Sequence, residues 1–258
     1  MKAVLEGATL SGGNSTVAVT SSNGFRFFVH EDSRTPVLIP LSLQNIKVEN
    51  HLVVFGRGPI VSVVEHLFSA LYGLGVYDVR IDVHGNALPF FDGSSKRFAD
   101  MLQPFNEKKP VDAMTIHERL DIREAESFIC YEPTDGDRLY IEMELRHPFI
   151  QTQRIELAIN KESYLRDIAP ARTFVFTSEE DPRLRNLPPY GIGITRTKVY
   201  SAEPLRFPDE LVRHKVLDLL GDLYILRRRI TGKITACNTS HRLNLQFVRA
   251  VSGQKGIP

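Results

Sequence analysis

A polar stretch at residues 106–112, NEKKPVD, divides the chain into two parts that each contain strand-like runs and two helix-like runs. Charged residues and a proline between periodic segments are typical of a linker. With 258 residues, the chain is long enough for two domains of ordinary size. We therefore expect an α+β fold of two similar units, the first over residues 1–108 and the second over residues 112–258.

Hydrophobic periodicity predicts the elements of both units. Apolar residues recur at helical spacing in residues 62–74, and the alternation of a strand follows in residues 76–83. The Ser-Ser-Asn-Gly sequence within residues 15–30 predicts a β-hairpin, because Asn-Gly readily supplies positive φ. The same patterns predict further helices at about 95–103, 208–227 and 240–251, and strands at 115–123, 127–132, 138–146 and 231–238.

Charge and hydropathy limit the partners of the chain. The formal net charge is +1 and no stretch is dense in Lys and Arg, so we do not expect nucleic acid to bind. The chain begins without the apolar core of a signal peptide, and no run of about 18 apolar residues occurs. We expect a cytoplasmic monomer without stable membrane insertion, for which transient contact with a membrane surface stays open.

The segment LVRHKVLDLLGDLYIL at residues 211–226 predicts a helix with three polar groups along one face. His214, Asp218 and Asp222 are spaced four residues apart. A histidine and a carboxylate one helical turn apart can bind one divalent ion, because their Cβ atoms lie about 5–6 Å apart. The same spacing is also typical of an ion pair on the surface of an amphipathic helix, so both interpretations stay open.

Glu65 and His66 lie in an otherwise apolar helical run, VSVVEHLFSAL. Burying an acid and an imidazole there is costly unless they are paired or bind a metal. The alternative is a boundary position at which both side chains reach solvent. A further isolated histidine, His241, follows Ser240 at the start of the last predicted helix, where an exposed residue would be equally ordinary.

These residues together match a metal site without thiolates. Cys130 and Cys237 are too few for a thiolate site, so any metal must be held by histidine and carboxylate side chains. Two histidines and one carboxylate form catalytic zinc sites that keep one coordination position open. A nearby carboxylate and histidine can then serve as base and acid in amide hydrolysis. The same ligands also describe the facial triad of non-haem iron oxygenases.

Five stretches of the chain carry a family resemblance. They span residues 63–245 and are VVEHLFSALYGLGV, LPFFDGSS, IAPARTFVF, LRFPDELVRHKVLDLLGDLYIL and SHRLN. In this order and with these intervals they resemble the UDP-3-O-acyl-N-acetylglucosamine deacetylases of lipid A biosynthesis. The resemblance implies hydrolysis of the N-acetyl group of that acylated nucleotide sugar by a Zn²⁺-dependent enzyme, in which Fe²⁺ could replace Zn²⁺. It also implies two α+β domains, each a sheet with two helices, with the helices packed between the sheets and the active site at the domain interface.

The resemblance also implies a role for each matching side chain. The metal ligands are expected to be His66, His214 and Asp218. Glu65 resembles the base that deprotonates the attacking water. His241 resembles the acid that protonates the leaving amine, and Asp222 resembles the carboxylate that orients this acid.

On the substrate side, the resemblance implies contacts from four residues. Thr173 matches the hydroxyl that stabilises the oxyanion. Phe174 and Phe176 resemble aromatic residues that contact the substrate, and Lys215 resembles a cation near its nucleotide portion.

The chain departs from the family pattern near the substrate. Ser11 stands where a histidine is usual, and Asn238 stands where a lysine is usual. Residues 175–200 are shorter than the family insert that forms an apolar passage for the acyl chain. A different N-acetylated sugar or sugar nucleotide therefore stays open as the substrate. A non-catalytic sugar-nucleotide binding protein is the other alternative, which the presence of both Glu65 and His241 disfavours.

Overall fold

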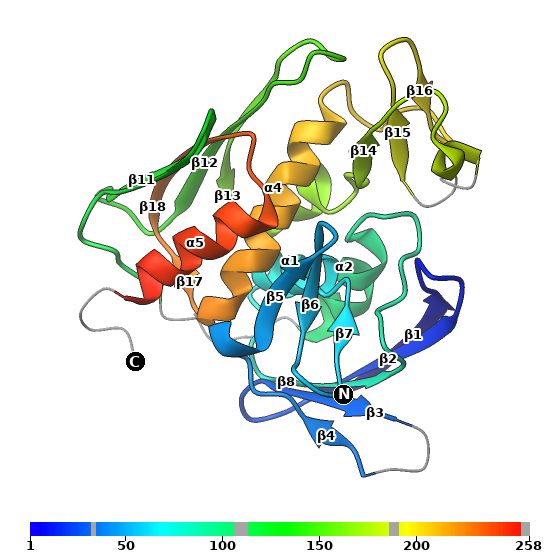
Figure 1. The fold of residues 1–258 in the computed structure, drawn as a ribbon. Coiled ribbons are helices and arrows are strands. Elements are labelled where there is room, and N and C mark those ends of the chain that lie inside the picture. Colours follow the sequence, from blue (N-terminus) through cyan, green and yellow to red (C-terminus); the bar gives the residue numbers. More distant parts are fainter. Residues whose placement is uncertain (32–34, 106–112, 186–190, 254–258) are drawn as a thin grey trace.

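The computed structural model describes residues 1–31, 35–105, 113–185 and 191–253. The predicted linker at residues 106–112 lies outside the described residues. The protein folds around two five-stranded β-sheets with helices between them (Figure 1). This arrangement confirms the predicted α+β class.

The first sheet is built from the N-terminal half. In their order across the sheet, its strands are β1 (Lys2–Ala8), β2 (Asn14–Ser21), β8 (Val79–His84), β3 (Arg26–His30) and β4 (Val37–Leu38). The central strand β8 is antiparallel to β2 and parallel to β3. Parallel neighbours need a crossover connection, and helix α1 (Glu65–Leu74) lies on the connection from β3 to β8.

The second sheet repeats this topology. In their order across the sheet, its strands are β10 (Leu120–Glu124), β11 (Ser127–Glu132), β18 (Gly232–Cys237), β12 (Leu139–Leu145) and β13 (Gln153–Ile159). The central strand β18 is antiparallel to β11 and parallel to β12, with helix α4 (Glu210–Leu223) on the crossover. The shared strand order supports two units of similar plan. Their boundaries at 1–108 and 112–258 stay a prediction.

The predicted hairpin over residues 15–30 is wrong, because β8 lies between β2 and β3 and pairs with both. Gly24 does adopt a positive φ of 80°. Its N–H donates to the Asp78 side chain at 2.8 Å, and the N–H of Ser22 donates to the Asp78 carbonyl at 3.0 Å. The turn between β2 and β3 thus passes over the N-terminal end of β8. Local turn chemistry cannot reveal a strand that arrives much later in the chain.

The predicted helices are all present among the described residues. They are α1 (Glu65–Leu74), α2 (Lys96–Leu102), α4 (Glu210–Leu223) and α5 (His241–Ser252). Helix α1 ends at Gly75, whose φ of 69° is the left-handed conformation that closes a last helical turn. Helix α5 begins after Ser240, whose side-chain oxygen accepts the Leu243 N–H at 3.2 Å.

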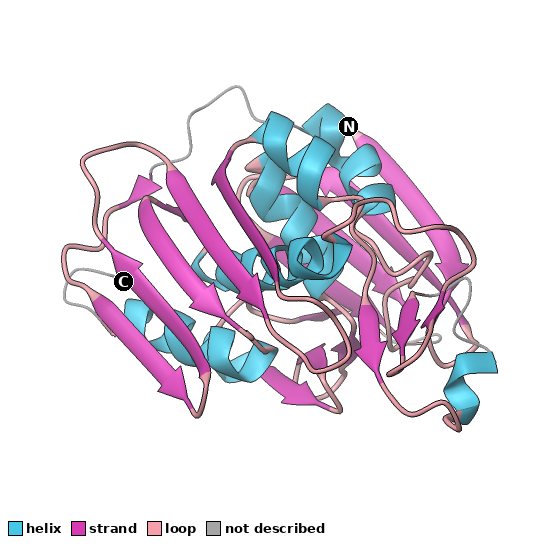
Figure 2. Cartoon of the chain, turned by 90° about the horizontal axis from the view of Figure 1, so that it is seen from above, coloured by secondary structure: helices cyan, strands magenta, loops and turns pink. Residues whose placement is uncertain are grey.

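Helices α1 and α4 pack directly against each other between the two sheets (Figure 1). Seen from above, the strands gather in two groups on either side of the helices (Figure 2). Every residue of α1 is buried, and apolar side chains from both sheets and both helices form one core. The helical layer therefore carries side chains from both halves of the chain into the same interior.

Shorter elements complete the fold. A three-stranded sheet contains β5 (Ile46–Glu49), β6 (Leu52–Phe55) and β7 (Val61–Ser62), and another contains β14 (Phe174–Phe176), β15 (Ile192–Ile194) and β16 (Val199–Tyr200). A two-stranded pair joins β9 (Ala113–Met114) to β17 (Arg229–Ile230). The short helical turns are η1 (Leu43–Asn45), η2 (Gln103–Phe105), α3 (Lys161–Ser163), η3 (Tyr164–Ile168), η4 (Pro182–Arg185) and η5 (Tyr224–Leu226). Within the described residues, none of the helices combines the length and the apolar character needed to cross a membrane.

Candidate metal centre and active site

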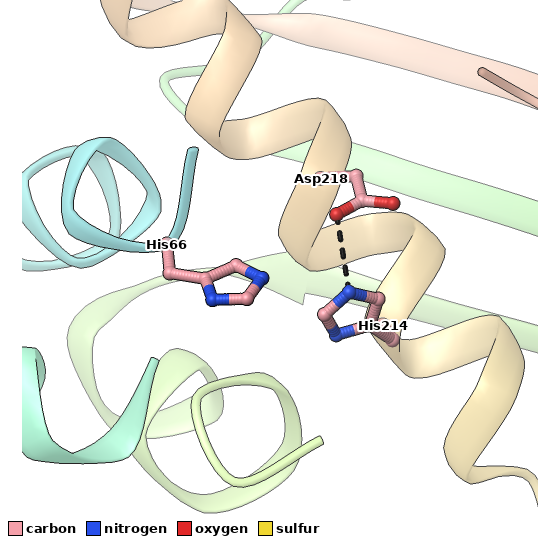
Figure 3. Close-up of side chains that lie close together, drawn as sticks. All are labelled: His66, His214 and Asp218. Carbon is pink, nitrogen blue, oxygen red and sulfur yellow. Dashed lines mark ion pairs between the residues drawn. The ribbon is translucent and has the colours of Figure 1, made fainter. Parts of the chain in front are cut away.

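The three side chains expected to bind a metal converge between α1 and α4 (Figure 3). His66 is the second residue of α1, whereas His214 and Asp218 lie one turn apart on α4. One ligand atom of each side chain lies within 4.8 Å of the other two, and all three residues are buried. The contact between the two helices thus joins groups that are far apart in the sequence.

Local sequence places His66 at the start of α1. Glu65 is the first residue of the helix, where a negative charge suits the positive end of the helix dipole. The backbone carbonyl of His66 accepts a hydrogen bond from the Ser95 hydroxyl, next to the start of α2. The first turn of α1 is therefore tied to its neighbouring helix.

A backbone carbonyl orients the ring of His214. Its Nδ1 donates to the carbonyl oxygen of Ala171 at 3.1 Å, since a carbonyl can only accept. Its Nε2 then faces Asp218 Oδ1 at 3.2 Å. Bonds from Zn²⁺ to such ligands are about 2.0–2.2 Å long, so two ligands of one tetrahedral ion lie about 3.3 Å apart. The observed separation fits a shared ion.

His66 has the protonation state of a metal ligand. Burial lowers the pKa of His66 to about 3, and the neighbouring His214 is the second largest cause of this shift. The ring is therefore neutral at physiological pH, and its buried Nδ1 has no hydrogen-bond partner. A neutral imidazole can bind a metal, whereas an unpartnered buried nitrogen is costly.

Asp218 contributes a carboxylate to the candidate ligand set. Burial alone would raise its pKa, but the cationic forms of His214, Lys215 and His241 outweigh burial and hold the pKa well below its usual range. Metal ligands must be deprotonated, and a neutral imidazole and an ionised carboxylate meet that requirement. The residues present therefore fit a divalent ion.

Glu65 directly precedes the candidate ligand His66 in α1 and has the properties expected of a base. Its side chain is buried, and its Oε2 has no hydrogen-bond partner. Burial raises the pKa of Glu65 to about 7, although the positive charge of His241 partly opposes this shift. A general base is most effective when its pKa lies near the working pH.

His241, the first residue of α5, forms a buried pair with Asp222 of α4. Its Nδ1 donates to Asp222 Oδ2 at 2.8 Å, and its Nε2 lies 3.9 Å from Asp218 Oδ1. Burial opposes a charge on His241, but Asp222 and Asp218 outweigh it and raise the pKa of His241 to about 10. The Nε2 of His241 therefore carries a proton on the side of the candidate ligand Asp218.

Phe174 and Lys215 lie next to His214. The Phe174 ring lies 6.2 Å from the His214 ring, measured between centroids, and Lys215 Nζ lies 5.4 Å from the Phe174 centroid. Lys215 also donates to Asp218 Oδ2 at 3.2 Å. Phe176 lies further out, 5.4 Å from Phe174 between ring centroids. The predicted substrate residues on β14 thus form an aromatic row that starts at the candidate metal ligand His214.

Backbone hydrogen bonds hold Thr173 immediately before β14. Its N–H donates to the Gly93 carbonyl at 2.8 Å, and its carbonyl accepts the Ile192 N–H at 2.9 Å. Thr173 lies two residues after Ala171, whose carbonyl orients His214. This segment therefore runs beside the candidate ligand His214, while the oxyanion role of the Thr173 hydroxyl stays a prediction.

The sequence patterns did not reveal two side chains around the site. Asn244 donates to Asp222 Oδ2 at 2.8 Å, the same oxygen that binds His241. The ring of His147 stacks on Phe176 with centroids 3.6 Å apart. Asn244 lies one turn after His241, and this spacing was a usable signal. No comparable signal marks His147, because only tertiary packing brings it to β14.

Known proteins are similar to the chain along almost its whole length. The family described as UDP-3-O-acyl N-acetylglycosamine deacetylase matches residues 2–252. A protein named UDP-3-O-acyl-N-acetylglucosamine deacetylase from Myxococcus xanthus (strain DK1622) is 32% identical over 234 residues, which cover 87% of this chain and 74% of that protein. A protein of the same name from Xanthomonas euvesicatoria pv. vesicatoria (strain 85-10) is 35% identical over 209 residues, which cover 76% of this chain and 68% of that protein. The chain therefore belongs to the UDP-3-O-acyl-N-acetylglucosamine deacetylase family.

Proposed function

We propose that this protein removes the N-acetyl group of UDP-3-O-acyl-N-acetylglucosamine by metal-dependent hydrolysis, a step of lipid A biosynthesis. The observation that carries the proposal is the buried cluster of three candidate ligands, His66, His214 and Asp218. The candidate acid His241 lies 3.9 Å from Asp218, and the candidate base Glu65 directly precedes His66 in α1. Family membership supports the same reaction. A protein that only binds sugar nucleotides needs neither Glu65 nor His241, and an iron oxygenase shares only the ligand set.

The metal ligands of the proposed enzyme are His66, His214 and Asp218, and the proposed ion is Zn²⁺. Fe²⁺ can bind the same ligand set. When bound, such an ion supplies a Lewis acid that polarises the amide carbonyl and makes a water molecule more acidic.

Glu65 and His241 move the two protons that amide hydrolysis requires. Glu65 accepts a proton from the attacking water, for which a pKa of about 7 suits neutral solution. His241 donates its Nε2 proton to the leaving nitrogen of the sugar. Asp222 supports this step, because its bond to Nδ1 at 2.8 Å fixes the ring and stabilises its positive charge.

The residues on β14 and at the start of α4 contact the substrate in this proposal. The Thr173 hydroxyl donates to the developing oxyanion, a contribution typically worth about 2.7–4 kcal/mol for one donor. Phe174 and Phe176 contact the sugar or acyl portion, and Lys215 lies near the nucleotide portion. The contact between the Phe174 and His214 rings supports this arrangement.

A second candidate substrate is an N-acetylated sugar or sugar nucleotide of different structure. Asn238, which stands where the family resemblance leads us to expect a lysine, favours this candidate. Its side-chain oxygen accepts the Arg146 N–H at 2.8 Å, and its φ is 49°. The Asn238 side chain therefore accepts a backbone hydrogen bond. Because it is neutral, it provides no cation that could bind a diphosphate.

Some wider properties belong to the same proposal. We propose that the protein is a cytoplasmic monomer of two domains, 1–108 and 112–258. Acetate release by the purified protein tests the activity. Its molar mass, measured by light scattering, tests the monomeric state.

Parallel assays of two substrates distinguish the candidate reactions. We expect acetate release from UDP-3-O-acyl-N-acetylglucosamine and much slower release from the parent UDP-N-acetylglucosamine, which lacks the acyl chain. Equal turnover of both compounds would contradict the acyl-specific reaction. Metal analysis and an oxygen-uptake assay on the same sample test the oxygenase alternative, which requires iron and oxygen consumption.

A further inference from the structure

A buried ion pair joins the start of α4 to the segment before β14. The side chains of Arg172 and Glu210 are 3% and 0% exposed. Glu210 Oε1 accepts from Arg172 Nε at 2.8 Å, and Oε2 accepts from Arg172 Nη2 at 3.0 Å. A buried pair of this kind is often no more stabilising than two apolar side chains of similar size. Stabilisation of the fold is therefore not a sufficient reason for an ion pair at this buried position.

The same carboxylate also holds one end of a peptide group. Glu210 Oε1 accepts the backbone N–H of Arg172 at 3.0 Å. This N–H belongs to the peptide unit whose carbonyl is that of Ala171, and that carbonyl accepts the His214 Nδ1–H at 3.1 Å. The unit is planar and is not among the cis bonds, so its N–H and C=O point in opposite directions. One rigid group thus links Glu210 to His214.

We propose that Glu210 is a positioning residue for His214 and acts through this peptide group. Histidine ligands usually donate their second nitrogen to a carboxylate or a carbonyl, which fixes the ring and makes it a stronger ligand. Here the carboxylate polarises the peptide, and hydrogen bonds in a chain strengthen one another. The Ala171 carbonyl then holds His214 more firmly, with Nε2 directed at the other ligands. The inference rests on the metal site of the proposed function.

Further hydrogen bonds prevent the Glu210–Arg172 pair from turning away. The backbone N–H of Arg206 donates to Glu210 Oε2 at 2.7 Å. Arg172 Nη1 donates to the Ser201 hydroxyl at 2.9 Å, and Nη2 donates to the Pro204 carbonyl at 2.9 Å. With both oxygens of Glu210 occupied, the carboxylate stays aligned with the peptide group.

Zn²⁺ affinity of the metal-free protein, measured by competition with a chromophoric chelator, tests this role without relying on activity. Glu210→Gln keeps the size of the side chain and removes its charge, and we expect affinity to fall by about 10–100-fold. Asp209→Asn is the matched control, because Asp209 lies at the same helix end and pairs with Arg213 at 2.7 Å. We expect this control to retain the parent affinity. Parent affinity in Glu210→Gln, or an equal loss in Asp209→Asn, would overturn the proposal.

The double substitution Arg172→Leu with Glu210→Met provides a second test. It removes both charges, so no unpaired arginine is left in the interior if Glu210→Gln alone fails to fold. We expect the same loss of Zn²⁺ affinity, together with an upfield shift of the His214 Nδ1–H proton resonance. An unchanged resonance and affinity would overturn the role of Glu210. The variant His214→Ala distinguishes a failure of the proposed metal site from a failure of the positioning role of Glu210. Unchanged Zn²⁺ affinity in that variant would contradict the metal site itself.

Discussion

Gly221 of α4 lies directly against the backbone of Glu65 in α1. A Cβ atom at position 221 would lie 2.4 Å from the Glu65 carbonyl oxygen, a distance that real contacts do not reach. The absence of a side chain at Gly221 therefore allows the two helices to approach closely, and this approach brings Glu65 and His66 of α1, the proposed base and one candidate metal ligand, to the candidate ligands of α4.

Gly221→Ala is expected to push α1 away from α4. Overpacking of this kind typically costs about 1–3 kcal/mol, and even a small shift between Glu65 and the ligands lowers kcat. Urea unfolding and steady-state kinetics measure the two effects. Gly136→Ala is the control, because a Cβ at Gly136 meets nothing within 4 Å. Full activity in Gly221→Ala would show that the close approach does not matter for catalysis.

Glu65→Gln is expected to lower kcat by about 10²–10⁴-fold, because the amide cannot accept a proton from water. The bound metal should remain, since Glu65 is not among the three proposed ligands. Acetate release and metal content of the purified variant give the two measurements. The exposed Glu6→Gln serves as the control and should behave as the parent does. Unchanged turnover in Glu65→Gln would remove this residue from the mechanism.

Removing the metal is expected to lower the melting temperature. At free Zn²⁺ about 1,000 times above the dissociation constant, binding adds about 4 kcal/mol to the free energy of unfolding. Each kcal/mol shifts Tm by about 2–4 °C for a protein near this size. Calorimetry with Zn²⁺ and with a chelator measures the difference. His66→Ala should show little response to Zn²⁺, and a parent protein that shows none would argue against the site.

The activity of the enzyme should depend on pH with a bell shape. The base must be ionised, so kcat/KM rises as pH increases through the pKa of Glu65, about 7. The acid must be protonated, so kcat/KM falls as pH increases through the pKa of His241, about 10. Apparent values from a pH series describe the coupled groups together. A profile that is flat from pH 5 to pH 11 would contradict both roles.

Asn244→Ala is expected to lower kcat by about tenfold with little change in KM. The Asn244 amide donates to Asp222 Oδ2 at 2.8 Å, and a hydrogen bond to a charged group is worth about 1.5–3 kcal/mol. Without it, Asp222 holds His241 less firmly during proton transfer. Gln246→Ala on the same helix is the control. Parent kinetics in Asn244→Ala would show that the bond from His241 alone keeps Asp222 in place.

Patterns of short range were sufficient to predict much of the fold. Helical spacing placed His214, Asp218 and Asp222 on one face of α4, because a helix repeats every 3.6 residues whatever surrounds it. The prediction of a hairpin between β2 and β3 was wrong because strand pairing is not local: β8, from a distant part of the chain, lies between them.

By itself, the sequence determined the helices, the α+β class and, through family motifs, the identity of the ligand candidates. Only the tertiary structure decided that these candidates meet. The contact of Gly221 with Glu65, the Ala171 carbonyl on His214, and the Asn244 amide on Asp222 all join separate elements. Spacing along one helix is set by local backbone geometry, whereas contacts between elements depend on how close-packed side chains allow whole helices and sheets to approach.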